Sequence, residues 1–77
     1  DTGFDLHHAD FAGRVTDGKK AKSFVNNVNV QDVNGHGTHC AGTVGGPAIS
    51  IGGIRYGVAP EAELLIGKVF DNASRPQ

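Results

Sequence analysis

The stretch Asn-Gly-His-Gly-Thr-His-Cys-Ala-Gly, residues 34–42, places two imidazoles and a thiol within five positions of a 77-residue chain. The compact run that begins at His36 is stopped by two adjacent glycines, Gly45 and Gly46. This pattern predicts a short buried helix from His36 to about Gly45. Glycine inside a helix costs roughly 1 kcal/mol relative to alanine, so we expect Gly42 to be there because another element packs closely against it.

The segments around this helix predict an α/β unit with a parallel sheet. The mostly apolar residues 63–70 predict a strand that is buried on both faces. Residues 1–5 are typical of a strand end that runs into a turn, and residues 47–56 form a glycine-rich loop. The order of strand end, helix and buried strand favours the α/β class. Lesser expectations are a helical turn at residues 7–11, polar loop at 14–22 and irregular extended structure at 23–30.

Composition limits the chain to one small domain and excludes several classes of partner. A single core is thin at this length, and one cysteine permits no internal disulfide. The formal net charge of −1 indicates neither a nucleic-acid nor a membrane partner, and no apolar run approaches the ~20 residues that span a bilayer. Because the chain opens on Asp1 without a methionine and closes abruptly on Gln77, we expect a piece of a longer protein.

Three kinds of chemistry could use residues 34–42. A zinc site could draw on His36, His39 and Cys40, but a structural site needs four ligands, and no second cysteine or CxxC motif is present. A cysteine nucleophile needs an exposed thiol with a lowered pKa. Cys40 lies instead among small apolar residues, which predicts a packed core thiol.

The third possibility is that His36 is a general base whose nucleophile lies elsewhere. A catalytic imidazole needs one nitrogen free to take a proton and the other held by a carboxylate. Asp1 fits the carboxylate, because it precedes Gly3 at the end of a predicted strand. Asp32, four residues before His36, is the local competitor. As a loop residue that leads into a helix, we expect it to satisfy backbone donors.

Three blocks of the sequence together resemble the subtilisin-like serine proteases, or subtilases. They are Asp1-Thr2-Gly3, residues 36–42 and residues 57–60, which read Gly-Val-Ala-Pro. Cys40 after the second histidine resembles the proteinase K-like, thiol-containing branch of that family. The resemblance implies a parallel-sheet, three-layer subtilisin-like fold. Residues 1–77 would then be part of one catalytic domain, truncated at both ends and without the half that bears the serine.

The resemblance also implies a function, namely serine endopeptidase activity through an Asp-His-Ser triad. By position in the motifs, Asp1 would orient the catalytic histidine and His36 would be the general base. The second histidine, His39, would be buried and structural. Asn34 would border the substrate cleft, and Phe70 would help to shape a subsite for the residue before the scissile one.

Partners and cofactors follow from the same resemblance. It implies polypeptide substrates, secretion from the cell, and dependence on the remainder of the catalytic domain for folding and activity. No cofactor is required. Calcium is a possibility, because Asp10 lies at the position that matches a calcium ligand of the family. The loop at residues 47–53 lacks the asparagine that many members contribute to that site.

Two rival hypotheses remain from the sequence. Asp1-Thr2-Gly3 is also the signature of aspartic proteases, in which two aspartates share a proton. A homodimer of that kind leaves the His36 block unexplained and calls for an all-β sequence. The second rival is a catalytically incomplete or pseudo-enzyme fragment that acts as a structural or interaction piece. None of Ser23, Ser50 and Ser74 lies in a nucleophile motif, so the 77-residue chain alone is predicted to be inactive.

Overall fold

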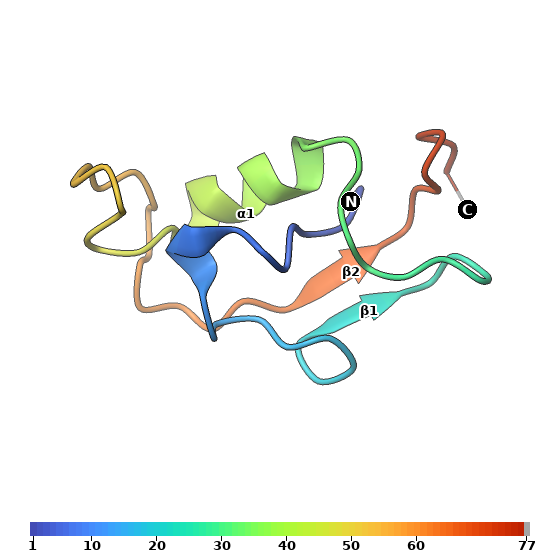
Figure 1. The fold of residues 1–77 in the computed structure, drawn as a ribbon, viewed down its shortest axis with the longest axis horizontal. Helices are drawn as coiled ribbons and strands as arrows, with labels where there is room; N and C mark the ends of the chain where they lie inside the picture. Colours follow the sequence, from blue (N-terminus) through green and yellow to red (C-terminus); the bar gives the residue numbers. More distant parts are fainter. Residues whose placement is uncertain (77) are drawn as a thin grey trace.

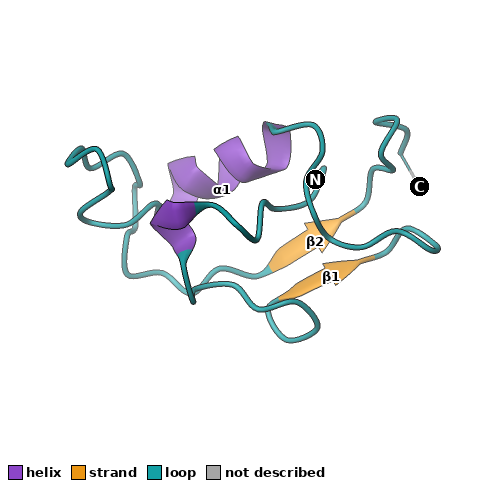
Figure 2. Ribbon diagram, in the orientation of Figure 1, coloured by secondary structure: helices purple, strands orange, loops and turns teal. Residues whose placement is uncertain are grey.

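The computed structural model describes residues 1–76, and Figures 1 and 2 show one α-helix lying over a small parallel sheet. The strands β1 and β2 pair in parallel, with Ala21 opposite Ile66 and Ser23 opposite Lys68. Helix and parallel strands agree with the predicted α/β class. The elements in chain order are the 3-10 helix η1 (Ala9–Phe11), β1 (Ala21–Ser23), α1 (His36–Gly45) and β2 (Ile66–Lys68).

The N-terminal segment joins this sheet through backbone hydrogen bonds. The carbonyl of Asp1 accepts from the N–H of Val69 (2.8 Å), just beyond β2. On the other side of this segment, the N–H of Phe4 donates to the carbonyl of Val30 (3.0 Å). The carbonyl of Phe4 accepts from the backbone N–H of Asp32 (3.1 Å). The segment that begins with Asp1 is therefore held between the end of β2 and the loop that precedes α1.

The hydrophobic core joins side chains from the N-terminal segment, α1 and the segment around β2. The rings of Phe4 and Phe11 meet edge to face, with their centroids 5.1 Å apart. Burial of apolar side chains from distant segments is the main force that holds so small a unit together. The buried cluster consists of Phe4, Phe11, Ala41 and Leu64, with Leu6, Val15 and Ile66 packed against it.

The C-terminal end of α1 is closed by Arg14. Its guanidinium donates hydrogen bonds to the carbonyl of Gly45, the last residue of the helix, and to that of Ala62 (2.8 Å). The last carbonyls of a helix have no partner within the helix, and a cation there also favours the helix dipole. Arg14 thus ties α1 to the turn that leads into β2.

The helix has the predicted bounds, but two predictions about burial are wrong. Only one side of α1 is buried, formed by Gly37, Ala41, Gly42 and Gly45. The strand within residues 63–70 is limited to β2, and Leu65 is 75% exposed. Successive side chains of an extended chain point to opposite sides, so Leu64 lies in the core with Ile66 packed against it, and Leu65 points away.

The predictions for the flanking segments were partly confirmed. The helical turn forms as η1 and is followed by Gly13 in a left-handed conformation (φ 77°). The polar loop at residues 14–22 was predicted too long, because β1 begins at Ala21 and depends on pairing with β2, a partner far along the chain. No helix in residues 1–76 is long and apolar enough to cross a bilayer.

Candidate active site

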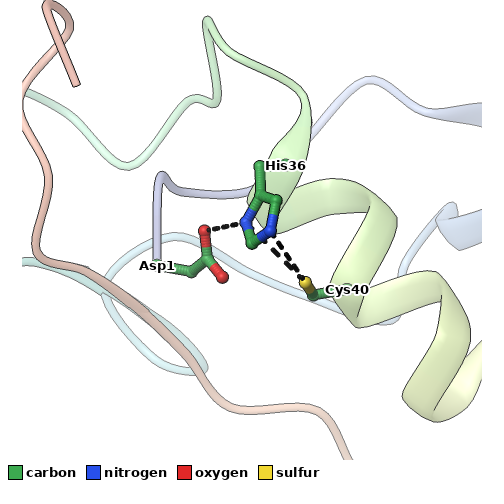
Figure 3. Close-up of side chains that lie close together, drawn as sticks. All are labelled: Asp1, His36 and Cys40. Carbon is green, nitrogen blue, oxygen red and sulfur yellow. Dashed lines mark hydrogen bonds and ion pairs between the residues drawn. The ribbon is translucent and has the colours of Figure 1, made fainter.

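Asp1 and His36 form a direct hydrogen bond in the folded chain. Asp1 Oδ1 lies 2.8 Å from His36 Nδ1. Figure 3 marks this hydrogen bond with a dashed line. An ionised carboxylate can only accept hydrogen bonds, so we assign the donated proton to Nδ1 of the imidazole. The lone pair of Nε2 is then free to accept a proton from another group. The His36 side chain is 67% exposed.

The start of α1 fixes the position of His36. The first N–H groups of a helix lack partners within the helix and need acceptors from outside it. Three side chains supply them in order. The acceptors are Asn34 Oδ1 for His36 N (3.0 Å), Thr2 Oγ1 for Gly37 N (2.7 Å) and Asp32 Oδ2 for Thr38 N (3.0 Å).

Asp32 organises the loop before the helix. Its Oδ1 accepts from the N–H groups of Asn34 and Gly35 (2.9 Å each) and from the hydroxyl of Thr2 (3.0 Å). Partial burial opposes the charged form, but hydrogen bonds from Gly35 and Thr38 outweigh it and hold the pKa of Asp32 far below its ordinary value. The expectation that Asp32 serves backbone donors is confirmed.

The helix can approach the Asp1 segment because residue 37 is glycine. A Cβ at Gly37 would lie 2.9 Å from Thr2 Oγ1 and 3.0 Å from the backbone nitrogen of Gly3, and it would clash with the Gly3 carbonyl. Gly42 has the packing role predicted for it, since a Cβ there would meet the ring of Tyr56 at 3.2 Å.

Cys40 lies beside His36, and the prediction of a core thiol is wrong. Its Sγ is 3.8 Å from both ring nitrogens of His36, and the residue is half-buried. Residues four apart on a helix are neighbours on one face, which accounts for the contact. The thiol therefore borders the Asp1–His36 pair, as Figure 3 shows.

His39 is exposed, so the prediction that it is buried is also wrong. It lines a pocket on another side of α1, together with His8, Asp10, Thr43 and Tyr56 among others. The structure therefore does not bring His36, His39 and Cys40 together. The side chain that lies beside His36 and Cys40 is that of Asp1 rather than that of His39.

The two predicted substrate-binding residues lie close to the Asp1–His36 pair. Asn34 accepts the His36 N–H and donates to the hydroxyl of Ser74 through Nδ2 (3.1 Å). Phe70 is half-buried, and its N–H lies 3.4 Å from the carbonyl of Asp1. Both contacts fix position, and a role in substrate binding stays a prediction.

Asp10 contacts the glycine-rich loop through both carboxylate oxygens. Oδ1 accepts from the N–H of Ile51 (2.8 Å), and Oδ2 accepts from the hydroxyl of Tyr56 (2.7 Å). These two hydrogen bonds lower the pKa of Asp10. Desolvation, with the bond to Asp10 second, raises the pKa of Tyr56 to about 12. Both oxygens already have partners, and the role of Asp10 as a calcium ligand stays a prediction.

Sequence reasoning overlooked Thr2 and Thr38. The hydroxyl of Thr38 donates to Asp32 (2.8 Å) and accepts from the N–H of Asp5 (2.9 Å), so that it joins α1 to the N-terminal segment. Thr2 makes a parallel link from the same segment to Gly37. The signal was available, because each threonine stands within two positions of a candidate catalytic residue and can both donate and accept.

Comparison with known proteins identifies the family to which this chain belongs. The chain matches the sequence model of the Subtilase family over residues 1–76, and it therefore belongs to that family. It is 46% identical over 71 residues to "Subtilisin-like protease 6" of Arthroderma gypseum and to the protein of the same name of Trichophyton equinum. It is 46% identical over 72 residues to the "Cuticle-degrading protease" of Metarhizium anisopliae.

These matches cover most of this chain but little of each relative. They span 92% of the chain and 15% of the first two relatives, and 94% of the chain and 16% of the third. The chain thus corresponds to about a sixth of the length of the curated relatives it matches. No solved structure matches it significantly.

Proposed function

We propose that this chain supplies the aspartate and the general-base histidine of a serine endopeptidase. The observation that carries the proposal is the 2.8 Å hydrogen bond between Asp1 Oδ1 and His36 Nδ1, which leaves the lone pair of Nε2 free. Membership of the Subtilase family and relatives named as proteases support it. The chain would be part of a larger parallel-sheet, three-layer catalytic domain whose serine lies outside these 77 residues.

The geometry suits proton transfer by His36. Asp1 accepts the Nδ1 hydrogen bond, which fixes the tautomer and stabilises the imidazolium once it forms. Nε2 takes the proton of the serine hydroxyl as the oxygen attacks the peptide carbonyl. It then delivers that proton to the leaving amine. The N–H of Thr2, which donates to Asp1 Oδ1 (2.6 Å), holds the carboxylate in place.

The substrate is a polypeptide, and Asn34 and Phe70 border its binding site. Each is hydrogen-bonded to a member of the pair. Asn34 accepts the backbone N–H of His36, and the N–H of Phe70 donates to the carbonyl of Asp1. The mechanism uses no cofactor. Secretion from the cell is proposed from the family resemblance.

Replacement of Asp1 by asparagine in the full-length enzyme tests the proposal. The amide side chain would favour the wrong tautomer of His36, and kcat should fall by about 10⁴, as in the triad of an unrelated serine protease. Asp17→Asn is the matched control, because Asp17 is an exposed carboxylate outside the site, and kcat should be unchanged. A loss below about tenfold for Asp1→Asn would show that Asp1 does not orient the base.

A serine-directed phosphonate distinguishes an active enzyme from a pseudo-enzyme. An Asp-His-Ser enzyme is labelled at its serine, and labelling should be lost in His36→Ala because the serine is then no longer activated. A wild-type protein that folds but resists the reagent would support the pseudo-enzyme alternative.

A further inference from the structure

Three potential metal ligands meet in the structure, and two segments of the chain supply them. One ligand atom each from Asp1, His36 and Cys40 lies within 4.8 Å of the other two, and Figure 3 shows the side chains converging. Within residues 1–76, no other group of three or more histidine, cysteine and acidic side chains is arranged in this way. We propose that this cluster binds one zinc ion reversibly, and that the bound ion prevents His36 from acting as a base.

The ligand atoms all lie within 4.8 Å of one another, and they reach the separations of a zinc site after movements of up to about 1 Å. Zinc takes nitrogen at ~2.05 Å and sulfur at ~2.3 Å, so a tetrahedral site places these ligands about 3.6 Å apart. The observed separation of Cys40 Sγ from either nitrogen of His36 is 3.8 Å. Nitrogen and carboxylate oxygen would be about 3.4 Å apart in the same site. Asp1 Oδ1 must therefore move outward by about 0.6 Å from its 2.8 Å contact with Nδ1.

The side chains can make that movement without disturbing the core. The Asp1 and His36 side chains are 37% and 67% exposed, and Cys40 is half-buried. Their backbones are anchored by the hydrogen bonds that hold the start of α1 and the Asp1 carbonyl. Three protein ligands leave the fourth zinc position open to water.

The donor set selects zinc over the common hard cations. A thiolate and an imidazole are soft or borderline ligands, whereas calcium and magnesium require several oxygen ligands. Only Asp1 offers oxygen in this cluster. The thiol proton of Cys40 is released to solvent when the metal binds, because the thiolate is the ligand.

Loss of the general base follows from which nitrogen the metal occupies. A zinc ion on Nδ1 of His36 displaces the hydrogen bond to Asp1, and the ring proton then resides on Nε2. Nε2 has no free lone pair in that tautomer and cannot accept the serine proton. A zinc ion on Nε2 would block that atom directly, but it would be held by His36 and Cys40 alone, because Asp1 Oδ1 lies on the Nδ1 side of the ring. Sulfur is equally distant from both nitrogens, so either arrangement removes the base.

Inhibition by zinc rests on the proposed peptidase function, but metal binding does not. The first experiment therefore measures binding alone, with Co²⁺ as a spectroscopic probe for zinc in the full-length protein. We expect one equivalent of Co²⁺ to produce a thiolate-to-cobalt charge-transfer band, which Zn²⁺ then abolishes by displacement. A wild-type protein that gives no such band overturns the site, and this result does not depend on any variant.

Two variants identify the ligands. Cys40→Ser should abolish the charge-transfer band and weaken Co²⁺ affinity by at least about tenfold. Mutation of a residue that only hydrogen-bonds to a metal ligand already causes a loss of that size. His39→Gln is the matched control, because its ring is one residue away and lines a different pocket. It should retain the affinity of the wild type. Equal affinity in Cys40→Ser and wild type, or a loss in His39→Gln alone, would overturn the assigned ligand set.

The second experiment measures peptidase activity with zinc in a calcium-containing buffer, each protein relative to its own metal-free activity. Zinc should inhibit the wild type and His39→Gln, a zinc-selective chelator should restore both, and Cys40→Ser should require at least about tenfold more zinc. Full activity with saturated metal would overturn the inhibitory role. Metal binding by a protein without any peptidase activity would refute the proposed function and leave the zinc site standing.

Discussion

The hydroxyl of Thr2 accepts a hydrogen bond of 2.7 Å from the backbone N–H of Gly37, 35 residues further along the chain. Thr2 follows Asp1 directly, and Gly37 follows His36 directly. The bond therefore joins the immediate neighbours of the candidate catalytic pair, and it is buried although the pair itself is exposed. The separation of Asp1 from His36 thus depends on residues that do not take part in proton transfer.

Thr2→Val should lower both kcat and the free energy of unfolding of the full-length enzyme. The valine keeps the shape of threonine but leaves the Gly37 N–H without an acceptor in a buried position, which costs about 1–3 kcal/mol. Steady-state kinetics and chemical denaturation measure the two effects. Thr2→Ser retains the hydroxyl and serves as the control. Equal behaviour of the valine and serine variants would show that the bond does not position the pair.

Gly37→Ala should be strongly destabilising, although alanine has the higher helix propensity. Its Cβ would clash with the Gly3 carbonyl and push α1 away from the Asp1 segment. Overpacking of this kind costs about 1–3 kcal/mol, and activity should fall with it. Gly52→Ala is the matched control, because only Ser50 Oγ comes within 4 Å of the new Cβ. Similar melting temperatures for both variants would contradict the close approach.

Asp32→Asn should destabilise the full-length protein at neutral pH and less so in acid. The folded-state pKa of Asp32 lies below its ordinary value of 3.8, so its contribution is complete above the unfolded pKa. That contribution is lost as the pH falls below 3.8 toward the folded pKa. The loss at neutral pH should be about 1–2 kcal/mol, comparable to the loss of a helix N-cap side chain, because Asp32 accepts the N–H of Thr38 in the first turn of α1.

Chemical denaturation of the wild type and Asp32→Asn across this pH range checks the prediction for Asp32. The difference in the free energy of unfolding between the two proteins should decrease as the pH falls. A difference that stays constant would mean that the charge of Asp32 does not stabilise the start of α1.

Asp10→Asn should loosen the loop at residues 47–56 to the same extent with and without calcium. Both oxygens of Asp10 already accept hydrogen bonds, from Ile51 and Tyr56. Limited proteolysis of the loop and thermal melting, each with calcium and with a chelator, provide the measurement. Tyr56→Phe removes one of these bonds and should give a smaller effect. Calcium stabilisation that is present in the wild type and absent in Asp10→Asn would establish Asp10 as a calcium ligand.

The isolated 77-residue chain should show neither peptidase turnover nor a cooperative thermal transition. Within residues 1–76 the sheet has two strands of three residues each, and these offer little buried surface. A sharp transition in monomeric peptide would contradict the expectation, as would turnover that survives removal of contaminating proteases. The chain also exposes large apolar side chains, which favours poor folding in isolation. They include Ile49, Ile51, Ile54, Val58 and Leu65.

Local patterns predicted the helix and its bounds well. The run from His36 to the glycine pair at Gly45 and Gly46 contains its own stop signal, so no distant contact was needed to delimit α1. The β-strands were predicted less well. β1 starts at Ala21 only because β2 lies beside it, and such a pairing leaves little trace in a polar local sequence.

Side-chain environments were the least predictable feature. Cys40 and His39 are adjacent in sequence, and both were expected inside. One lies against His36 and the other lines a separate pocket. The environments of Cys40 and His39 differ because the packing of α1 against the Asp1 segment determines which side of the helix faces His36 and Asp1. The amino-acid composition does not predict this orientation.

The sequence by itself determined the family, the helix and the candidates Asp1 and His36, because these depend on residue type and spacing along the chain. The tertiary structure alone decided that the two meet at 2.8 Å, that Thr2 links their neighbours, and that Asp1 joins Cys40 and His36, whose contact follows from helical spacing, in one cluster. The bonds from Asp1 to His36 and from Thr2 to Gly37 each join residues 35 positions apart. Only the packing of α1 onto the N-terminal segment, which Gly37 permits, brings them within hydrogen-bond distance.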